Sequence, residues 1–139
     1  MNCEIRVNGQ LLPLNVWGGY IIAQKQDSQR DPSGFVFYRG HVSRNGRVFL
    51  GRAWGPYSRV IFQKTKFDID VAPKGWMIGT RLGKGNMVYL EQDYSGKGSN
   101  VNKRAKWSQH NLIESKMQPY TRANFIQDEW LATQPGTNY

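Results

Sequence analysis

The sequence predicts an all-β fold that ends in a short, partly helical C-terminal tail. Short strand-like runs recur along the chain, each bounded by Gly, Pro, Asn or Asp. Helical periodicity is weak until the tail, so no long helix is expected. Many short strands with almost no helix are typical of a sandwich, a barrel or a solenoid, and the spacing does not choose among these three.

The expected strands follow from the apolar and β-branched runs, taken in chain order. They are Cys3–Val7, Tyr20–Gln24, Phe35–Val42, Arg47–Gly51, Arg59–Phe67 and Met87–Gln92. Polar or Pro-containing loops separate them, such as Gln26–Ser33 and Asp70–Gly75. In the tail, Leu112–Gln118 and Thr121–Ile126 are expected to form short helices. No repeat of fixed period is visible.

Length and charge limit the classes of function. A chain of 139 residues makes one domain or less, and 19 Lys and Arg against 10 Asp and Glu give a net charge of +9. A basic chain with interleaved aromatic residues suits either nucleic acid or an acidic polysaccharide, or it has a merely cationic surface. No nucleic-acid-binding signature is present, and no stretch approaches the roughly 20 apolar residues of a membrane helix. We therefore expect neither nucleic acid nor a membrane as partner.

The most informative run is Leu50–Val60, which reads Leu-Gly-Arg-Ala-Trp-Gly-Pro-Tyr-Ser-Arg-Val. Residues i and i+2 of a strand lie on one face, so Arg52 and Trp54 are expected side by side. A guanidinium fork pairs with carboxylates, and an indole face covers a pyranose ring, so the pair suits a sugar acid. The alternative is structural, with Arg52 stacked on Trp54 to hold a loop at the strand end.

Other chemistry-bearing residues do not form recognisable sites. His41 and His110 lack metal-ligand spacing, and there is no Cys/His cluster, nucleophile elbow or phosphate loop. Cys3 is the only cysteine, so it forms no internal disulfide, and we expect it to be a small buried hydrophobe. Short Gly-Lys-Gly runs at 83–85 and 96–98 are expected to be turns. We expect no metal and no cofactor.

Several segments together resemble one family. Leu50–Val60 is similar to the Leu-Gly-Arg-(Pro/Ala)-Trp signature of plant pectinesterases, the pectin methylesterases. Further segments similar to that family occur in family order at Cys3–Ile5, Ile22–Lys25, Ser33–Phe37, Ala72–Trp76, Gly96–Ser99, Lys103–Trp107, Phe125–Ile126 and Trp130–Leu131. The match covers about residues 3–131. The resemblance implies a right-handed parallel β-helix, with residues 1–139 forming a single partial catalytic domain.

The resemblance also implies an activity. Such enzymes hydrolyse the methyl esters of homogalacturonan to pectate and methanol. One Asp attacks the ester, a second Asp is acid and then base, and two Gln side chains stabilise the oxyanion. Arg52 matches the Arg that orients the nucleophilic Asp, and Trp54 matches the Trp that stacks on substrate. The implied partner is pectin, the implied location is the extracellular cell wall, and the protein is expected to be a monomer.

This chain departs from the family pattern in two ways. Its Asp residues, Asp27, Asp31, Asp68, Asp70, Asp93 and Asp128, do not match the catalytic positions. Asp68 and Asp70 are expected to be ordinary solvent-facing charge. Gly79 stands where the family has a second groove Trp. We therefore expect the C-terminal coils of a β-helix, as a fragment, a truncated gene model or a decayed copy, that is inactive alone. The alternative is a non-catalytic protein that binds acidic polysaccharide.

Three further tryptophans and one tyrosine have expected roles outside the Arg52 site. Trp76, Trp107 and Trp130 are expected to be structural. Tyr57 either flanks the substrate groove or packs in the core.

Overall fold

The computed structural model describes residues 3–9, 13, 16–79, 86–121 and 124–125. Its strands are β1 (Cys3–Asn8), β2 (Tyr20–Gln24), β3 (Phe35–Tyr38), β4 (Gly40–Asn45), β5 (Arg47–Ala53), β6 (Arg59–Gln63), β7 (Lys66–Phe67), β8 (Asp70–Val71), β9 (Trp76–Ile78), β10 (Val88–Gln92) and β11 (Gln109–His110). A short helix α1 (Glu114–Met117) and a 3-10 turn η1 (Gln118–Tyr120) follow.

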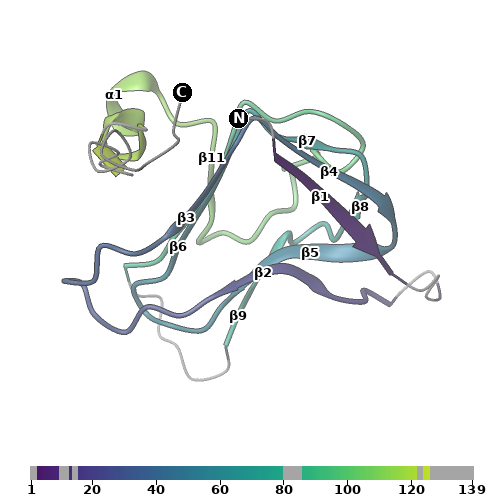
Figure 1. The fold of residues 1–139 in the computed structure, drawn as a ribbon, viewed down its shortest axis with the longest axis horizontal. Coiled ribbons are helices and arrows are strands. Elements are labelled where there is room, and N and C mark those ends of the chain that lie inside the picture. The colour runs from purple at the N-terminus through teal and green to yellow at the C-terminus, as the bar shows by residue number, and fades with distance from the viewer. Residues whose placement is uncertain (1–2, 10–12, 14–15, 80–85, 122–123, 126–139) are drawn as a thin grey trace, which may run out of the picture.

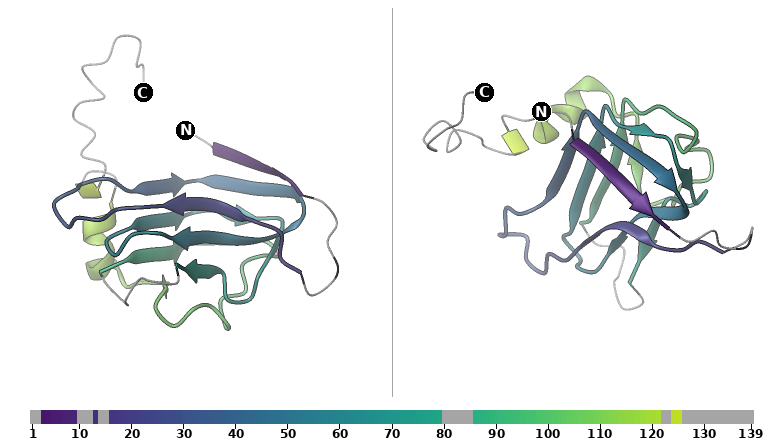
Figure 2. Two further views of the ribbon diagram at one scale, coloured as in Figure 1. Left: turned by 90° about the horizontal axis from the view of Figure 1, so that it is seen from below. Right: turned by 45° about the vertical axis from the view of Figure 1, so that its right-hand side comes forward.

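The strands form three parallel sheets that enclose one interior (Figure 1). The first sheet has the order β1-β4-β7, the second β2-β5-β8 with β9 also paired to β5, and the third β11-β10-β6-β3. Each of the first three turns contributes one strand or strand pair to every sheet, and the next turn adds β11 to the third sheet. Figure 2 shows the strands of successive turns stacked on one another. In Figure 1 the chain runs clockwise away from the viewer, so the coil is right-handed. The expected right-handed parallel β-helix is confirmed.

Coil length varies along the helix. Cys3 pairs with Gly40, 37 residues later, whereas His41 pairs with Lys66, 25 residues later. In the third sheet Leu90 pairs with Gln109, 19 residues later. Loops of different length at the corners absorb these differences, which is why the sequence shows no fixed repeat.

Two expected strands are wrong in extent, because each contains a corner. Phe35–Val42 was expected to be one strand, but the chain turns at Arg39, where φ is +54°. Arg59–Phe67 turns in the same way at Lys64, where φ is +52°. The two corners stack, because Tyr38 and Gln63 just before them are paired partners. Neither position carries the Gly or Asn that usually marks a left-handed residue, so the corners gave no sequence signal.

An aromatic column fills the interior of the helix. Phe37 stacks on Phe62 with ring centroids 4.7 Å apart, and Phe62 lies 5.8 Å from Trp76. Trp76 meets Tyr89 at 5.0 Å, and Tyr89 meets Trp107 at 5.3 Å. Because successive coils supply these rings, the column ties the coils together along the helix axis. Trp76 is fully buried, which confirms its structural role, whereas Trp130 lies outside the described residues.

The tail covers the outer face of the third sheet. Met117 of α1 packs against Ile61 and Leu90, which are fully buried although they do not belong to the interior column. The middle strands β6 and β10 are therefore buried on both faces, and Figure 1 shows α1 on the outer side of this sheet. The helix expected at Leu112–Gln118 is confirmed in shorter form as α1. Of the one expected at Thr121–Ile126, three of six residues lie outside the described part of the chain.

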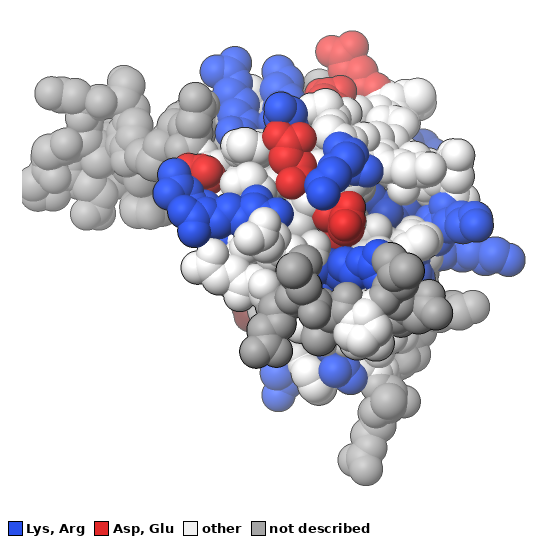
Figure 3. Space-filling model, turned by 90° about the vertical axis from the view of Figure 1, so that its right-hand side faces the viewer, with Lys and Arg blue, Asp and Glu red and all other residues white. Residues whose placement is uncertain are grey.

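The first sheet carries interleaved charges on its outer face. Arg6 binds Glu4 at 2.8 Å, and Asp68 binds both Lys66 and His41 at 2.9 Å. Figure 3 shows acidic side chains surrounded by Lys and Arg on this side of the molecule. Cys3 at the start of β1 is exposed, so the expectation that it is buried is wrong. Among the described strands, β1 pairs with β4 alone and so lies at the edge of the first sheet.

Within the described part of the chain, no helix has the length and apolarity needed to cross a membrane.

Candidate functional site

The structure brings Arg52 and Trp54 together at the end of β5. The guanidinium carbon of Arg52 lies 4.2 Å from the centroid of the Trp54 ring. A second ring, that of Tyr20 at the start of β2, lies 5.6 Å from the same carbon. Trp54 is 48% exposed and Tyr20 is 41% exposed, so both rings have a face open to solvent. The guanidinium is held between two aromatic rings, an arrangement that suits both interpretations of the pair.

The neighbouring turn fixes the backbone of Trp54. Its N–H donates to the carbonyl of Gln24 at 3.0 Å, and Tyr57 N–H donates to the carbonyl of Gln26 at 3.1 Å. Gly55 lies so close to this segment that a Cβ there would come within 2.3 Å of the Gln26 carbonyl oxygen. Only glycine fits this contact, which explains the Trp-Gly pair of the motif. Tyr57 itself is half-buried.

On the other side of Arg52, the third coil lines the site. Met77 of β9 is the paired neighbour of Arg52 in the sheet. Gly79 follows β9, is buried, and donates its N–H to the carbonyl of Ala53 at 2.9 Å. At the position where the resemblance leads one to expect a second groove tryptophan, the chain therefore offers backbone and no aromatic face.

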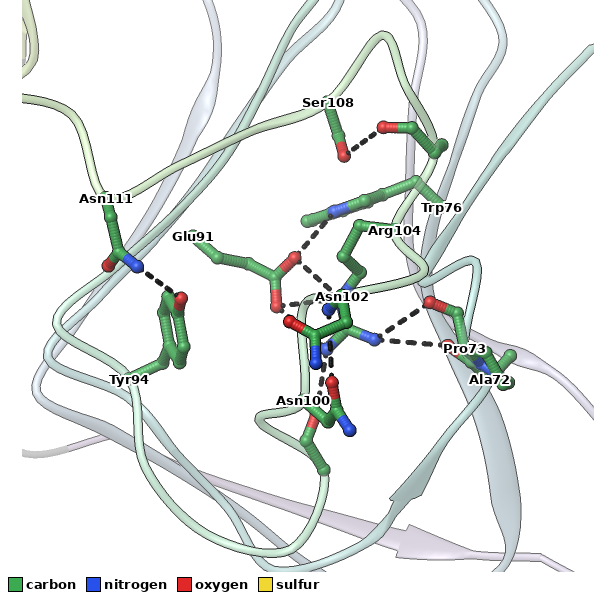
Figure 4. A network of polar contacts seen from close by, with 12 residues as sticks. Ala72, Pro73, Trp76, Glu91, Tyr94, Asn100, Asn102, Arg104, Ser108 and Asn111 are labelled. Atoms are coloured by element: carbon green, nitrogen blue, oxygen red, sulfur yellow. Dashed lines mark hydrogen bonds and ion pairs between the residues drawn. The ribbon is translucent and has the colours of Figure 1, made fainter.

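A buried ion pair holds the coils beneath this sheet (Figure 4). Arg104 Nε donates to Glu91 Oε2 at 2.9 Å, and Arg104 Nη2 donates to Glu91 Oε1 at 3.0 Å. Trp76 Nε1 donates to the same carboxylate at 3.1 Å. The remaining N–H groups of Arg104 donate to the carbonyls of Ala72, Pro73 and Gly98. Every charge in the network is thus paired and hydrogen-bonded, as a buried ion pair requires.

This network explains two of the sequence motifs. Gly75 has φ of +68°, and a Cβ there would lie 2.5 Å from Arg104 Cδ. In the Pro-Lys-Gly-Trp segment, Gly75 therefore leaves room for the Arg104 side chain, and Trp76 donates a hydrogen bond to Glu91. The Lys-Arg-Ala-Lys-Trp segment supplies the guanidinium. These motifs stabilise the helix and position β9 beside Arg52.

Tyr89 and Asp68 are among the groups whose pKa is shifted by their surroundings. Burial raises the pKa of Tyr89 to about 12, although its hydroxyl donates to Ser58 Oγ at 2.9 Å. Hydrogen bonds from Lys66 and then from His41 hold the pKa of Asp68 below its usual value. Asp68 is thus ion-paired on the first sheet, and Asp70 binds Lys97 at 3.2 Å. Neither aspartate pairs with Arg52.

The described residues contain no group of three or more His, Cys, Asp or Glu side chains placed to hold a metal ion. His41 pairs with Asp68, and His110 lies on a separate sheet in β11. The Gly-Lys-Gly run at 96–98 forms a turn in which Gly96 has φ of +91°. The equivalent run at 83–85 lies outside the described residues.

The comparison with protein families decides the ancestry. The family model Pectinesterase matches residues 1–129 of this chain. The chain belongs to the pectinesterase family. Probable pectinesterase 55 of Arabidopsis thaliana is 40% identical over 126 residues, which are 90% of this chain and 38% of that protein. Putative pectinesterase 10 of the same plant is 35% identical over 135 residues, covering 96% of this chain and 40% of that protein.

The fold agrees with a solved pectinesterase structure. Pectin methylesterase from carrot superposes with a TM-score of 0.76 at 20% identity, over 98% of this chain and 46% of that one. This likeness supports the parallel β-helix described above. The chain spans about two fifths of the length of the plant pectinesterases that it matches.

Sequence reasoning missed two residues of the pectinesterase chain that matter here. Tyr20 is the second ring against Arg52, and it comes from a different coil, so no spacing in the sequence connects the two. Glu91 is the buried partner of Arg104. A signal for Glu91 was present, because it directly follows the apolar run Val88–Leu90, and a carboxylate in such a strand is rarely buried without a cation.

Proposed function

We propose that this chain is part of the catalytic domain of a pectinesterase, a carboxylic ester hydrolase that converts methyl-esterified homogalacturonan to pectate and methanol in the plant cell wall. Family membership supports this proposal, and the arrangement of Arg52 against Trp54 carries it. In the proposed reaction a carboxylate nucleophile attacks the ester, a second carboxylate transfers protons, and amide donors stabilise the oxyanion.

Two residues of this chain have roles in the proposed site. Arg52 orients the nucleophilic Asp of the complete domain, since a guanidinium fork fixes a carboxylate through two parallel hydrogen bonds. Trp54 offers its exposed face to a galacturonate ring. Arg52 Nε is shielded from solvent and has no hydrogen-bond partner among the described residues, which leaves a donor available for such a carboxylate.

The 139-residue chain by itself is proposed to be inactive. Among the described residues, the ion pairs of Asp and Glu involve other cations, namely Arg6, Lys25, His41, Lys66, Lys97 and Arg104. Arg52 has no carboxylate to orient in that part of the chain. Catalysis requires a barrier lowering of about 8 kcal/mol or more, which binding groups alone do not supply.

The same observation favours a second candidate function, a non-catalytic protein that binds acidic polysaccharide. A single charged contact contributes about 1.5–3 kcal/mol, so binding of de-esterified oligogalacturonate is expected at roughly millimolar affinity. This binding weakens as salt is raised, because exposed charges are screened.

One experiment tests both functions on the pure 139-residue chain. Methanol release from methyl-esterified pectin is measured first, and none above background is expected. Trp fluorescence then follows titration with de-esterified oligogalacturonate, for the natural chain and for Arg52→Ala and Trp54→Ala. Arg6→Ala, which removes an exposed arginine on the first sheet, is the control.

If the pure chain releases methanol and Arg52→Ala abolishes this release, the isolated chain is an active enzyme and the proposal of inactivity is wrong. Binding that neither Arg52→Ala nor Trp54→Ala weakens would remove the proposed site.

A further inference from the structure

Two successive corners of the β-helix carry long cationic side chains in left-handed backbone conformations. Arg39 has φ of +54° and Lys64 has φ of +52°. They lie on neighbouring coils, because the residues just before them, Tyr38 and Gln63, are paired partners. This corner joins the third sheet to the first, whereas Arg52 belongs to β5 in the second sheet. The corner is therefore a part of the surface separate from the proposed pectinesterase site.

Hydrogen bonds hold these two corners in place. Arg39 N–H donates to the carbonyl of Gln63 at 2.9 Å, and Lys64 N–H donates to the carbonyl of Gln92 at 2.8 Å. The hydroxyl of Thr65, which is 1% exposed, donates to the same Gln63 carbonyl at 3.3 Å. Left-handed angles are unfavourable for residues other than glycine, and such strain is concentrated at functional sites. The two cations are thus fixed on neighbouring coils at a cost that a glycine or an asparagine would reduce.

Both cations lack an anionic partner in the described part of the chain. Arg39 Cζ lies 5.3 Å and Lys64 Nζ lies 5.7 Å from the centroid of the Tyr38 ring, and neither cation forms an ion pair with a described residue. The following corner carries Asp93, at φ of +53°, and none of those ion pairs joins it to Lys64. Neighbouring strands are about 4.8 Å apart, and like charges on adjacent strands repel. An anion bound between the two cations would lower this repulsion.

The two cations line a hollow of about 450 Å³ at the start of the first sheet. Its lining residues are Cys3, Glu4, Arg39, His41 and Lys64. Glu4 is the one carboxylate of this lining, and Arg6 binds it at 2.8 Å. His41 Nε2–H donates to Asp68 at 2.9 Å, so a neutral His41 ring has no further N–H for a ligand. The two corner cations therefore remain as the unneutralised charges of the hollow.

A guanidinium and an ammonium group on neighbouring coils suit an anion with three or more oxygens. The planar fork of an arginine takes two oxygens side by side, and a lysine takes another as a point charge. A carboxylate has only two oxygens, whereas a phosphate or sulfate group presents oxygens to both cations at once. We propose that the corner formed by Arg39 and Lys64 is a binding site for a tetrahedral oxyanion, a phosphate or sulfate group. This inference does not depend on the proposed function, because Arg52 and Trp54 take no part in it.

The test compares anions on the 139-residue chain by NMR at constant ionic strength, so that screening is the same throughout. With inorganic phosphate, the Nε–H of Arg39 and the backbone N–H of Gly40 are expected to shift with half-saturation at roughly millimolar concentration. Acetate is expected to bind at least about tenfold more weakly, because it loses one charged contact. Glucose 6-phosphate presents the same group as an ester on a larger molecule.

Matched variants show which side chains bind the anion. Arg39→Gln and Lys64→Gln are each expected to weaken phosphate binding by about tenfold or more. Arg39→Lys keeps the charge but loses the planar fork, so part of the affinity is lost. Arg44→Gln is the control, because Arg44 is an exposed arginine of β4 that also has a left-handed φ, +87°, and forms no ion pair with a described residue. This control is expected to leave phosphate binding unchanged.

The thiol of Cys3 gives a second readout that needs no variant to fold. Its reaction rates are measured with an anionic disulfide reagent, dithiobis(nitrobenzoate), and with a neutral one, dithiodipyridine. The ratio of the anionic to the neutral rate is expected to be at least about threefold larger for the native chain than for the urea-unfolded chain, because the hollow attracts anions. Phosphate at constant ionic strength is expected to lower the native ratio.

The outcomes decide for or against the site. If phosphate leaves Arg39 and Gly40 unshifted, if acetate binds as tightly, or if the Cys3 ratio is the same in the native and unfolded chains, the oxyanion site is wrong. If Arg44→Gln weakens binding as much as Arg39→Gln, the attraction is to a generally cationic surface and the proposal is overturned. Equal affinity for phosphate and its ester would mean that the phosphate group alone is recognised, and exclusion of the ester would restrict the site to the free ion; both results support the site. None of these outcomes changes the proposed function, which is tested at Arg52.

Discussion

Replacing Glu91 by Gln is expected to destabilise the protein more than any surface substitution. The side chain of Glu91 is fully buried and that of Arg104 is 2% exposed, so neither can turn to water when its partner is lost. The carboxylate accepts hydrogen bonds from Arg104 and from Trp76. Gln has the same shape but no charge. Its amide NH2 would face an N–H donor of Arg104 or Trp76, so one hydrogen bond would be replaced by a contact between two donors.

The magnitude follows from what remains around Arg104. In the variant, the Arg104 guanidinium keeps its hydrogen bonds to the carbonyls of Ala72, Pro73 and Gly98. It loses the only carboxylate that it contacts among the described residues. Breaking a buried pair by removing one partner costs about 3–5 kcal/mol. The whole stability of a domain is about 5–15 kcal/mol, so a large share of it is lost. With a urea m-value of about 2 kcal/mol/M, the unfolding midpoint falls by about 2 M.

The assay is urea unfolding followed by far-ultraviolet circular dichroism. Glu4→Gln is the matched control, because it removes the carboxylate of the exposed Arg6 pair and is expected to leave the midpoint unchanged. The double change Glu91→Leu with Arg104→Met removes both charges and is expected to cost less than Glu91→Gln alone. The reasoning is refuted if Glu91→Gln unfolds at the same urea concentration as Glu4→Gln, or if the double change is the more damaging.

Three further predictions follow from single positions. Gly75→Ala is expected to cost about 1–3 kcal/mol in urea unfolding, because φ is +68° and the added Cβ would overlap Arg104; an unchanged midpoint would contradict this contact. Tyr89 is expected to remain protonated until about pH 12, so its stabilising contribution is complete below the unfolded pKa of about 10 and is lost as pH rises toward 12. Tyrosinate absorbance of the native chain measures this, and complete titration of all tyrosines near pH 10 without unfolding would disprove it. Cys3 is exposed, so the native chain should react with a thiol reagent as fast as the urea-unfolded chain, whereas slow reaction would mean that β1 is covered.

The strands were largely predictable, but the corners between them were not. Alternating apolar runs located β1, β2, β5 and β10 closely, because strand formation depends on local side-chain character. Arg39 and Lys64 adopt left-handed backbone angles without glycine, because stacking on the neighbouring coil compensates the local strain. That compensation comes from residues about a coil away in the chain. The burial of Cys3 was predicted wrongly for a related reason. Whether a strand residue is buried depends on which other segments pack against that strand, and this is a property of the tertiary structure.

The candidate site also combines features that could be predicted from the sequence with features that only the tertiary structure decides. The sequence by itself determined the family segments and the adjacency of Arg52 and Trp54, since these depend on residue identity and near spacing. Tertiary structure alone decided that Tyr20 lies beside Arg52, that Arg47 lies over the Trp17 ring, and that Glu91 neutralises Arg104. Each of these contacts joins residues at least 13 positions apart, such as Glu91 and Arg104. The coil lengths of the β-helix set which residues meet across sheets, and those lengths vary with loops whose conformation is fixed only when the coils stack.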